Sequence, residues 1–381
     1  MAFLRNRAVN QLNLHIGITA LAQGMGGVFV LVFLLRAGVT IPASLCAMAV
    51  IFAGRFALRP VVLPAAVRFG LKPLVIGGNL VIALSYPLLG EVTGADESLL
   101  LYCLALALGD TVYWTCLHAY FALLGDEEHR GHQISAGVAL SALVGVVAPL
   151  IGAAALGTLG PRAAFGVVGL VQAVSVAPLL TIAQVRIPRT APESFRASLP
   201  GVGLFMADGW LSTSYIIVWQ IALFYSLGQS LSAYGVAMAL AALVGAVSGM
   251  LLGRHVDGGN GRAGVAIACS AVSLVLLARA ASLATPWLAV AANAAGAIAG
   301  CLLAPVQMVP VYNLAQRSPC ALRFHIAAEG GWDIGGFTGC LAAAGWVASG
   351  ASLATVMPLG FLGVLGQVLL LRRYYRRLDA W

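Results

Sequence analysis

Apolar runs long enough to cross a membrane follow one another along the whole chain, separated by short polar segments. A run of about 18 or more mostly apolar residues spans the hydrocarbon core of a bilayer as a helix. We place twelve such spans. Their bounds are residues 12–35, 40–58, 73–90, 98–122, 134–157, 163–185, 201–226, 230–252, 264–283, 286–312, 322–348 and 354–372. The pattern predicts an all-α integral membrane protein.

Composition strengthens this prediction and excludes a soluble domain. Of 381 residues, 61% are hydrophobic and 9% are charged, whereas about 25% are charged in ordinary soluble proteins. The longest polar interval, residues 186–200, is too short to fold by itself. The seven cysteines are scattered and odd in number, so we expect neither a disulfide framework nor a cysteine metal site.

Basic residues orient the predicted spans in the membrane. With the N-terminus inside, seventeen basic residues, among them Arg59, fall in inner segments, and only Arg36, Arg162 and Arg279 fall in outer ones. Cytoplasmic loops are enriched in Lys and Arg, so we expect a multi-pass protein of a bacterial cytoplasmic (inner) membrane with both termini cytoplasmic. The net charge of +8 is explained by this distribution, and we expect no nucleic-acid partner.

The chain also repeats weakly at half its length. Lys72 and Arg262 lie 190 residues apart, as do Gly38 and Gly228, and the polar segment 186–200 lies at the midpoint. Two parallel six-helix halves are typical of a large class of secondary transporters. We therefore expect a six-helix bundle over residues 1–185, a cytoplasmic linker over 186–200 and a second six-helix bundle over 201–381.

The loops after spans 2 and 8 carry a motif that resembles the major facilitator superfamily signature, approximately G-x-L-a-D-R-x-G-R-K. The matching residues are Arg68, Gly70 and Lys72 in the first copy, and Gly253, Asp257 and Arg262 in the second. Val67 stands where the first copy of the family motif has its aspartate. The resemblance covers the whole chain through topology. It implies twelve transmembrane helices in two pseudo-symmetric six-helix bundles, and alternating access.

The same resemblance implies that spans 1, 4, 7 and 10 line a central cavity. Each of these spans carries polar or aromatic residues that recur on one helical face. The candidate cavity residues are His15, Thr19, Gln23, Asp110, Tyr113, Trp114, His118, Asp208, Ser212, Tyr215, Trp219, Asn293 and Gln307. The neutral residues have a second interpretation as hydrogen-bonding groups between helices. Acids without a clear basic residue favour a neutral or cationic solute, on which Trp114, Tyr215 and Trp219 would stack.

Span 11 has a further stripe of ionisable residues. His325, Glu329 and Asp333 follow one another at intervals of one helical turn. Acids in hydrocarbon are costly and are therefore candidates for function. Two like charges one turn apart also oppose double ionisation, which favours a proton carrier. Since spans 2 and 11 meet in this family, we predict that Arg55 pairs with Glu329 or Asp333 in a cytoplasmic gate.

These observations predict a secondary active transporter that moves a small organic solute by alternating access. Protons would be the coupling ion, with Asp110, Glu329 and Asp333 as carriers and His118 or His15 as relays. We expect a monomer without a cofactor. The chain has one lysine and no Walker A, HExxH or GxSxG motif, so we expect no ATP site and no enzymatic activity. Two alternatives remain: a metal-ion importer that uses His325, Glu329 and Asp333, and a non-transporting membrane sensor.

Overall fold

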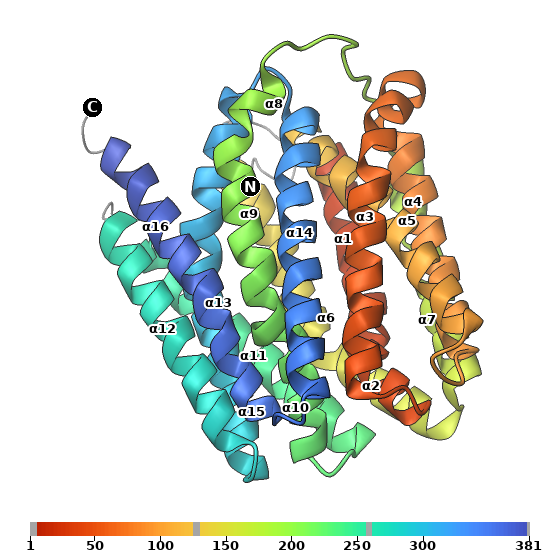
Figure 1. The fold of residues 1–381 in the computed structure, drawn as a ribbon. Helices are drawn as coiled ribbons and strands as arrows, with labels where there is room; N and C mark the ends of the chain where they lie inside the picture. The colour runs from red at the N-terminus through yellow and green to blue at the C-terminus, as the bar shows by residue number, and fades with distance from the viewer. Residues whose placement is uncertain (1–5, 125–129, 257–260, 379–381) are drawn as a thin grey trace.

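The computed structural model describes residues 6–124, 130–256 and 261–378, and within these ranges the regular structure is entirely helical (Figure 1). The first six spans are α1 (Arg7–Met25) with η2 (Gly27–Phe29) and α2 (Val30–Arg36), α3 (Ile41–Phe69), α4 (Leu71–Gly90), α5 (Glu97–Leu124), α6 (Arg130–Thr158), and α7 (Pro161–Val174) with η3 (Ala177–Thr181). The short α8 (Ser194–Ala197) lies in the connecting segment. The last six spans are α9 (Leu199–Ser212) with the π-helical η4 (Thr213–Val218) and α10 (Trp219–Ser226), α11 (Leu231–Val256), α12 (Gly261–Ser282), α13 (Pro286–Arg317), α14 (Ala321–Ala348), and α15 (Leu353–Val356) with η5 (Met357–Leu359) and α16 (Gly360–Leu378).

Eleven spans of the described chain are long and apolar enough to cross a membrane, and they coincide with predicted spans. The remaining predicted span, residues 322–348, corresponds to α14, whose acids and glycines reduce its hydropathy. The prediction of residues 40–58 for span 2 is wrong at its end, because α3 continues to Phe69 through Pro60 and Pro64. Prolines are tolerated in membrane helices when neighbouring helices satisfy the freed backbone groups. Arg59 therefore lies inside a helix and not in a loop.

The helices stand roughly side by side, with α3 and α14 adjacent in the middle of the view in Figure 1. The first six spans lie mainly on one side and the last six on the other. Contacts between the two groups are made chiefly by α3 with α14, α6 with α11 and α5 with α14. The segment that contains α8 crosses one end of the helices, which we call the linker end. The α3–α14 contact is therefore one of the two most extensive contacts that hold the two groups of spans together.

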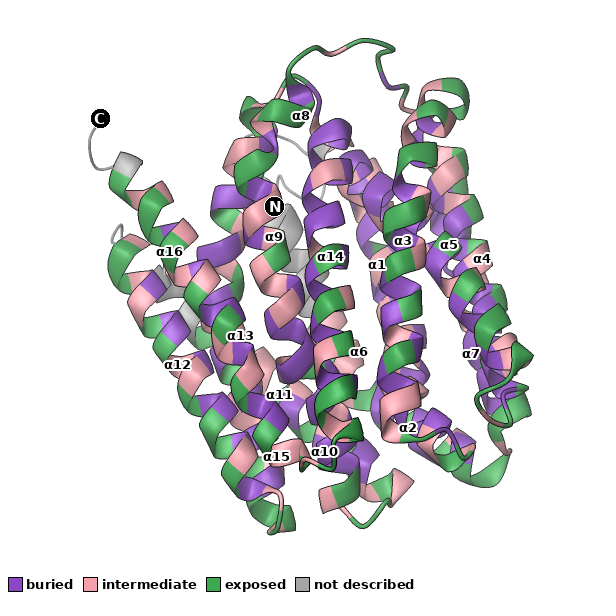
Figure 2. Ribbon diagram, viewed as in Figure 1, coloured by how far each residue is buried: buried purple, intermediate pink, exposed green. Residues whose placement is uncertain are grey.

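Exposed residues occur along the outer helices (Figure 2), and many of them are large and apolar. Leu84, Leu170 and Leu274, for example, are each more than 60% exposed. A soluble monomer does not expose contiguous apolar surface on this scale, whereas a bilayer covers it. With the eleven candidate spans, this surface identifies a multi-pass membrane protein.

Glycines bring α14 unusually close to α9. A Cβ atom added at Gly331 would overlap the carbonyl oxygen of Val202, and one added at Gly335 would overlap that of Met206. On the facing helix, a Cβ at Gly209 would overlap the carbonyl oxygen of Trp332. Small residues permit such backbone contact between membrane helices. The acidic helix α14 is thus fixed tightly on α9, while its opposite side faces α3.

Candidate functional site

Two arginines of α3 face two acids of α14. Arg55 and Arg59 are one helical turn apart, as are Glu329 and Asp333, so each pair lies on one face of its helix. Asp333 contacts both arginines. Its Oδ1 lies 2.9 Å from Nε of Arg55 as an ion pair without hydrogen-bond geometry, and its Oδ2 accepts a hydrogen bond from Nε of Arg59. This carboxylate is completely buried and joins the two arginines.

Glu329 is held by a second set of bonds that includes α5. Its Oε2 accepts hydrogen bonds from Nη1 of Arg59 at 3.0 Å and from the Thr115 hydroxyl at 3.2 Å. Arg59 Nη1 also donates to Thr115 Oγ1 at 3.0 Å. The three groups form a closed triangle across α3, α5 and α14. Arg59 thereby fixes two acids of α14 at once.

Asp110 completes the network from α5. Its Oδ2 accepts from Nη1 of Arg55 at 3.3 Å, and its side chain is 18% exposed, the most of any member. The Arg55 guanidinium lies 5.1 Å from the ring centroid of Trp332 and 6.0 Å from that of Phe52. Such cation–π contacts help an arginine to remain in a desolvated position. Asp110 is therefore paired with a cation, and it is also the member nearest to solvent.

The network contains three carboxylates and two guanidiniums. With all five groups ionised, it carries one excess negative charge. Oε1 of Glu329 has no hydrogen-bond partner within the described residues. A buried charge without compensation is costly, and protonation removes that cost. The arrangement is therefore suited to bind one proton.

The predicted pairing of Arg55 with Glu329 or Asp333 is confirmed for Asp333, whereas Glu329 pairs with Arg59. The sequence analysis missed Arg59 because it assigned this residue to a loop. Arg59 is only 3% exposed. The signal was present in the sequence: Arg55 and Arg59 have the same one-turn spacing as Glu329 and Asp333.

A stack of rings adjoins the network toward the linker end. The rings of Trp114 and His118 are stacked with centroids 5.9 Å apart, and His118 stacks on His325 with centroids 5.8 Å apart. Both ring nitrogens of the buried His325 lack a hydrogen-bond partner in the described structure. Among the described residues, no group of three or more His, Cys, Asp or Glu side chains is arranged to hold a metal ion. The acids of the proposed metal stripe are instead occupied by arginines.

Several predicted cavity residues of the first six spans instead join helices to one another. His15 Nδ1 lies 2.6 Å from the Ser175 carbonyl oxygen, and its Nε2 lies 2.8 Å from the Tyr113 hydroxyl. Thr19 donates to the Ser175 hydroxyl at 3.2 Å. His15, Thr19 and Tyr113 are fully or almost fully buried, so in this structure they line no open cavity. Gln23, one turn beyond Thr19, is half-buried.

Asp208 is the acid of the last six spans that we predicted in the cavity. Its carboxylate accepts hydrogen bonds from Trp332 Nε1 at 3.2 Å and Gln367 Nε2 at 3.1 Å, and it also interacts with Gln307. All of these groups are neutral. No basic side chain of the described residues forms a salt bridge with Asp208, in contrast to the acids of the network. Nearby Ser212 is buried.

The predicted aromatic residues of span 7 contact an arginine. The Arg279 guanidinium lies 4.3 Å from the ring centroid of Tyr215 and 4.7 Å from that of Trp219. Trp219 Nε1 donates to Asn293 Oδ1 at 2.9 Å, so three predicted residues do come together here. Arg279, which the charge distribution placed in an outer segment, lies in the last turn of α12 and is 3% exposed. Two residues that we predicted in the cavity therefore contact a basic side chain.

The loop motif residues lie at the linker end where the structure describes them. Lys72 Nζ donates to the carbonyl oxygens of Leu180 at 2.7 Å and Ile182 at 2.8 Å, which attaches α4 to the end of the sixth span. Gly70 has a positive φ of 80° and begins the turn into α4. Arg68 is exposed at the end of α3, Arg262 is exposed at the start of α12, and Gly253 belongs to α11. Asp257 lies outside the described residues.

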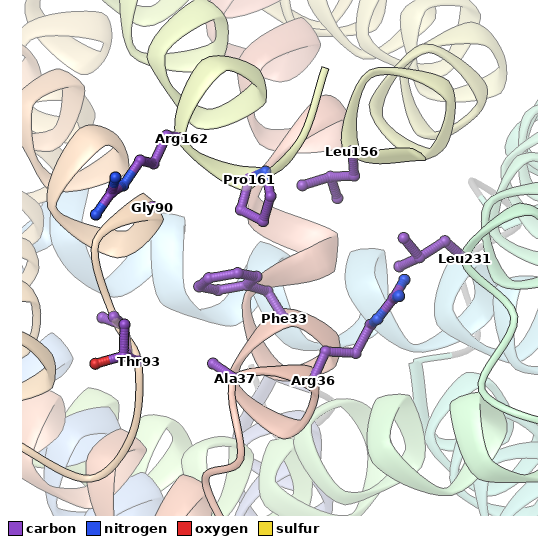
Figure 3. Close-up of a pocket in the computed structure, with 10 residues that line it drawn as sticks. Phe33, Arg36, Ala37, Gly90, Thr93, Leu156, Pro161, Arg162 and Leu231 are labelled. Atoms are coloured by element: carbon purple, nitrogen blue, oxygen red, sulfur yellow. The ribbon is translucent and has the colours of Figure 1, made fainter. Parts of the chain in front are cut away.

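A pocket of about 550 Å³ lies away from these groups, at the end opposite the linker (Figure 3). Phe33, Arg36, Arg162 and Leu231 are among its lining residues. Arg162 forms an exposed salt bridge of 2.7 Å with Glu91. None of the predicted cavity or gate residues lines this pocket, and we therefore do not assign it to the candidate site.

Comparison with known proteins establishes the fold. Neither a protein-family model nor a curated protein sequence matches the chain. The crystal structure of an auto-inhibited POT family peptide transporter is similar over 97% of each chain, with a TM-score of 0.64 and 13% sequence identity. At this identity the similarity concerns the fold alone. The chain is therefore a multi-pass membrane protein with the major facilitator fold that its loop motifs indicated.

Proposed function

We propose that the protein is a secondary transporter that moves a small organic solute across the cytoplasmic membrane by proton-coupled alternating access. The observation that supports this most directly is the ion-pair network of α3, α5 and α14. It connects the first six spans to the last six through five charged side chains. Any movement of α14 away from α3 must separate these pairs, so the network has the position of a gate.

The depth of the network agrees with a gate on the cytoplasmic side. Glu329 follows the start of α14 by eight residues, or about 12 Å along the helix from the linker end. The excess of basic residues at this end supports a cytoplasmic location for it. Arg55 lies midway along the 29 residues of α3, and Arg59 is one turn closer to the linker end. We infer that these ion pairs close the cytoplasmic half of the helix bundle and leave the opposite half free to open.

Proton coupling follows from the charge balance of the network. A proton added to one carboxylate removes the excess negative charge and also removes an acceptor from an arginine. Within the network, Asp110 is the most accessible acid, and Oε1 of Glu329 has neither a hydrogen-bond nor an ion-pair partner among the described residues. His118 and His325, stacked beside Glu329, are placed to pass protons toward the linker end. Proton uptake would weaken the closed state and favour opening to the cytoplasm.

In this proposal the protein functions as a monomer, and its partners are a small solute, protons and the lipid bilayer. It requires no cofactor and carries out no enzymatic reaction. Partly exposed groups remain for solute contact after the buried residues are set aside. These are Gln23, Asp110, Trp114, His118, Asp208 and Tyr215.

Proteoliposomes with a pH-sensitive dye in the lumen test this function. Candidate solutes are added one at a time under an imposed proton gradient. With the wild-type protein, we expect the addition of at least one solute to produce a change in luminal pH that reports proton flux. Glu329→Gln should abolish the solute-dependent proton flux, while the control Glu91→Gln, at an exposed acid of the opposite end, should retain it. Absence of both solute and proton movement with folded wild-type protein would refute the proposal.

A further inference from the structure

Arg279 is a buried cation without an acidic partner among the residues that the structure describes. It lies three residues before the end of α12, at the end of the bundle opposite the linker, and it is 3% exposed. No acidic side chain among the described residues forms a salt bridge with it. Its Nε has no hydrogen-bond partner in that part of the chain. Of the other buried arginines in the described chain, Arg55 and Arg59 are paired with carboxylates, and Arg323 donates to the carbonyl oxygens of Pro188 and Arg189.

The position of Arg279 makes its burial unexpected. Arginines near helix ends usually extend along the helix surface so that the guanidinium reaches water. Helical side chains are tilted toward the N-terminus of their helix, which for α12 is the linker end. The guanidinium is accordingly directed into the protein and meets Gly296, ten residues inside α13. The protein thus holds a charge inside the membrane region although a solvated position was within reach.

The surroundings of Arg279 resemble a built binding site. Tyr215 and Trp219 are stacked against the guanidinium, and each ring is fixed by a bond to α13: the Tyr215 hydroxyl donates to the Gly296 carbonyl oxygen at 2.6 Å, and Trp219 donates to Asn293. Arg279 Nη1 donates to the Tyr215 carbonyl oxygen within the π-helical η4. Single π-helical turns are often found at functional sites.

We propose that Arg279 binds the carboxylate of the transported solute, through the Nε edge of its guanidinium. This inference rests on the proposed function and adds the chemical class of the solute. A guanidinium presents donors in a planar fork that matches a carboxylate. Aromatic faces keep the arginine in place without neutralising it. The site is closed in this structure, so an anion reaches it when the central cavity opens at the end opposite the linker.

Thermal unfolding of the detergent-purified full chain, followed by tryptophan fluorescence, tests the proposal. The probes are benzoate and 3-phenylpropionate, each compared with its neutral amide at equal salt. A ligand that binds only the folded state raises the melting temperature. We expect both carboxylates to raise it by several degrees and the amides to leave it unchanged. Arg279→Gln should remove this difference, and Arg36→Gln, at an exposed arginine, should preserve it.

A second variant covers the case in which Arg279→Gln does not fold. Gly296→Ala places a methyl group against Nη2 at the flexible end of the arginine side chain, so the guanidinium must shift while the backbone remains. This variant should also lose the response to the carboxylates. Equal responses to acids and amides, or a wild-type response in both variants, would overturn the inference. Proton flux that depends on Glu329 would then still support a transporter for a solute of another class.

Discussion

Arg59→Gln should open the protein at the linker end. Arg59 holds Asp333, Glu329 and Thr115 together. Its loss leaves Glu329 without a salt bridge and Asp333 with Arg55 alone among the described residues. Removal of one partner of a buried ion pair costs about 3–5 kcal/mol. Separation of the helices returns the carboxylates to water, so the cost falls on the closed state. At about 1.4 kcal/mol per factor of ten, the ratio of open to closed protein should rise by about 10² or more.

Cys320 offers a natural reporter of this opening. It precedes α14 at the linker end, is 7% exposed and belongs to an apolar cluster made largely of residues from the first six spans. Its rate of modification by N-ethylmaleimide, measured by peptide mass spectrometry, should increase at least tenfold in Arg59→Gln. Cys103, buried within the first six spans, should remain unreactive in both proteins.

The matched control is Arg162→Gln. Its salt bridge to Glu91 is short at 2.7 Å, but the two side chains are 74% and 53% exposed. Exposed pairs contribute about 0–1 kcal/mol, and so Cys320 should react at the wild-type rate. Lower pH should reduce the difference in the rate of Cys320 modification between Arg59→Gln and wild type. Protonation neutralises the carboxylates that have lost their arginine partner. Equal modification of Cys320 in wild type and Arg59→Gln would contradict the assignment of the network as a gate.

Two further predictions concern the acids. Asp333→Asn should increase the rate of Cys320 modification and lower the melting temperature more than Asp110→Asn does. The reason is that Asp333 is wholly buried between two arginines, whereas Asp110 is partly solvated and contacts one. Equal effects of the two substitutions, or the reverse order, would contradict the assignment of Asp333 as the acid that joins both arginines. Asp208→Asn should leave the melting temperature within about 1 °C of wild type or raise it. Neutral donors bind this acid, so the substitution removes a charge that no cation compensates. A large decrease in the melting temperature would instead indicate that Asp208 has a cationic partner in the folded protein.

The sequence predicted most of the fold because a bilayer imposes simple rules. Spans must be apolar for about twenty residues, and their number and orientation follow from charge. The end of span 2 was misjudged because Pro60 and Pro64 with Arg59 resemble a loop. In the structure, α5 and α14 satisfy the arginine, which no local pattern reveals.

The candidate site was predicted in its components and less well in its contacts. Helical spacing identified the Glu329 and Asp333 face, and the resemblance to the major facilitator superfamily indicated its partner Arg55. Spacing does not reveal whether a polar face meets a cavity or another helix. His15 and His118 have similar sequence surroundings, yet His15 is fixed between Tyr113 and the Ser175 carbonyl oxygen while His118 is partly open. Such a distinction requires the rotation and neighbours of each helix.

The glycine contact between α14 and α9 determines which helices can separate. Backbone packed on backbone offers no charge to neutralise, so protons cannot weaken it, whereas α3 and α14 are held by groups that titrate. Under a proton gradient, α14 should therefore travel together with α9 and leave α3 behind. Asp208 moves with α9, and so does the π-helical turn that holds Arg279. Protonation at the α3–α14 interface would in this way move the solute-contacting helices as a single rigid unit.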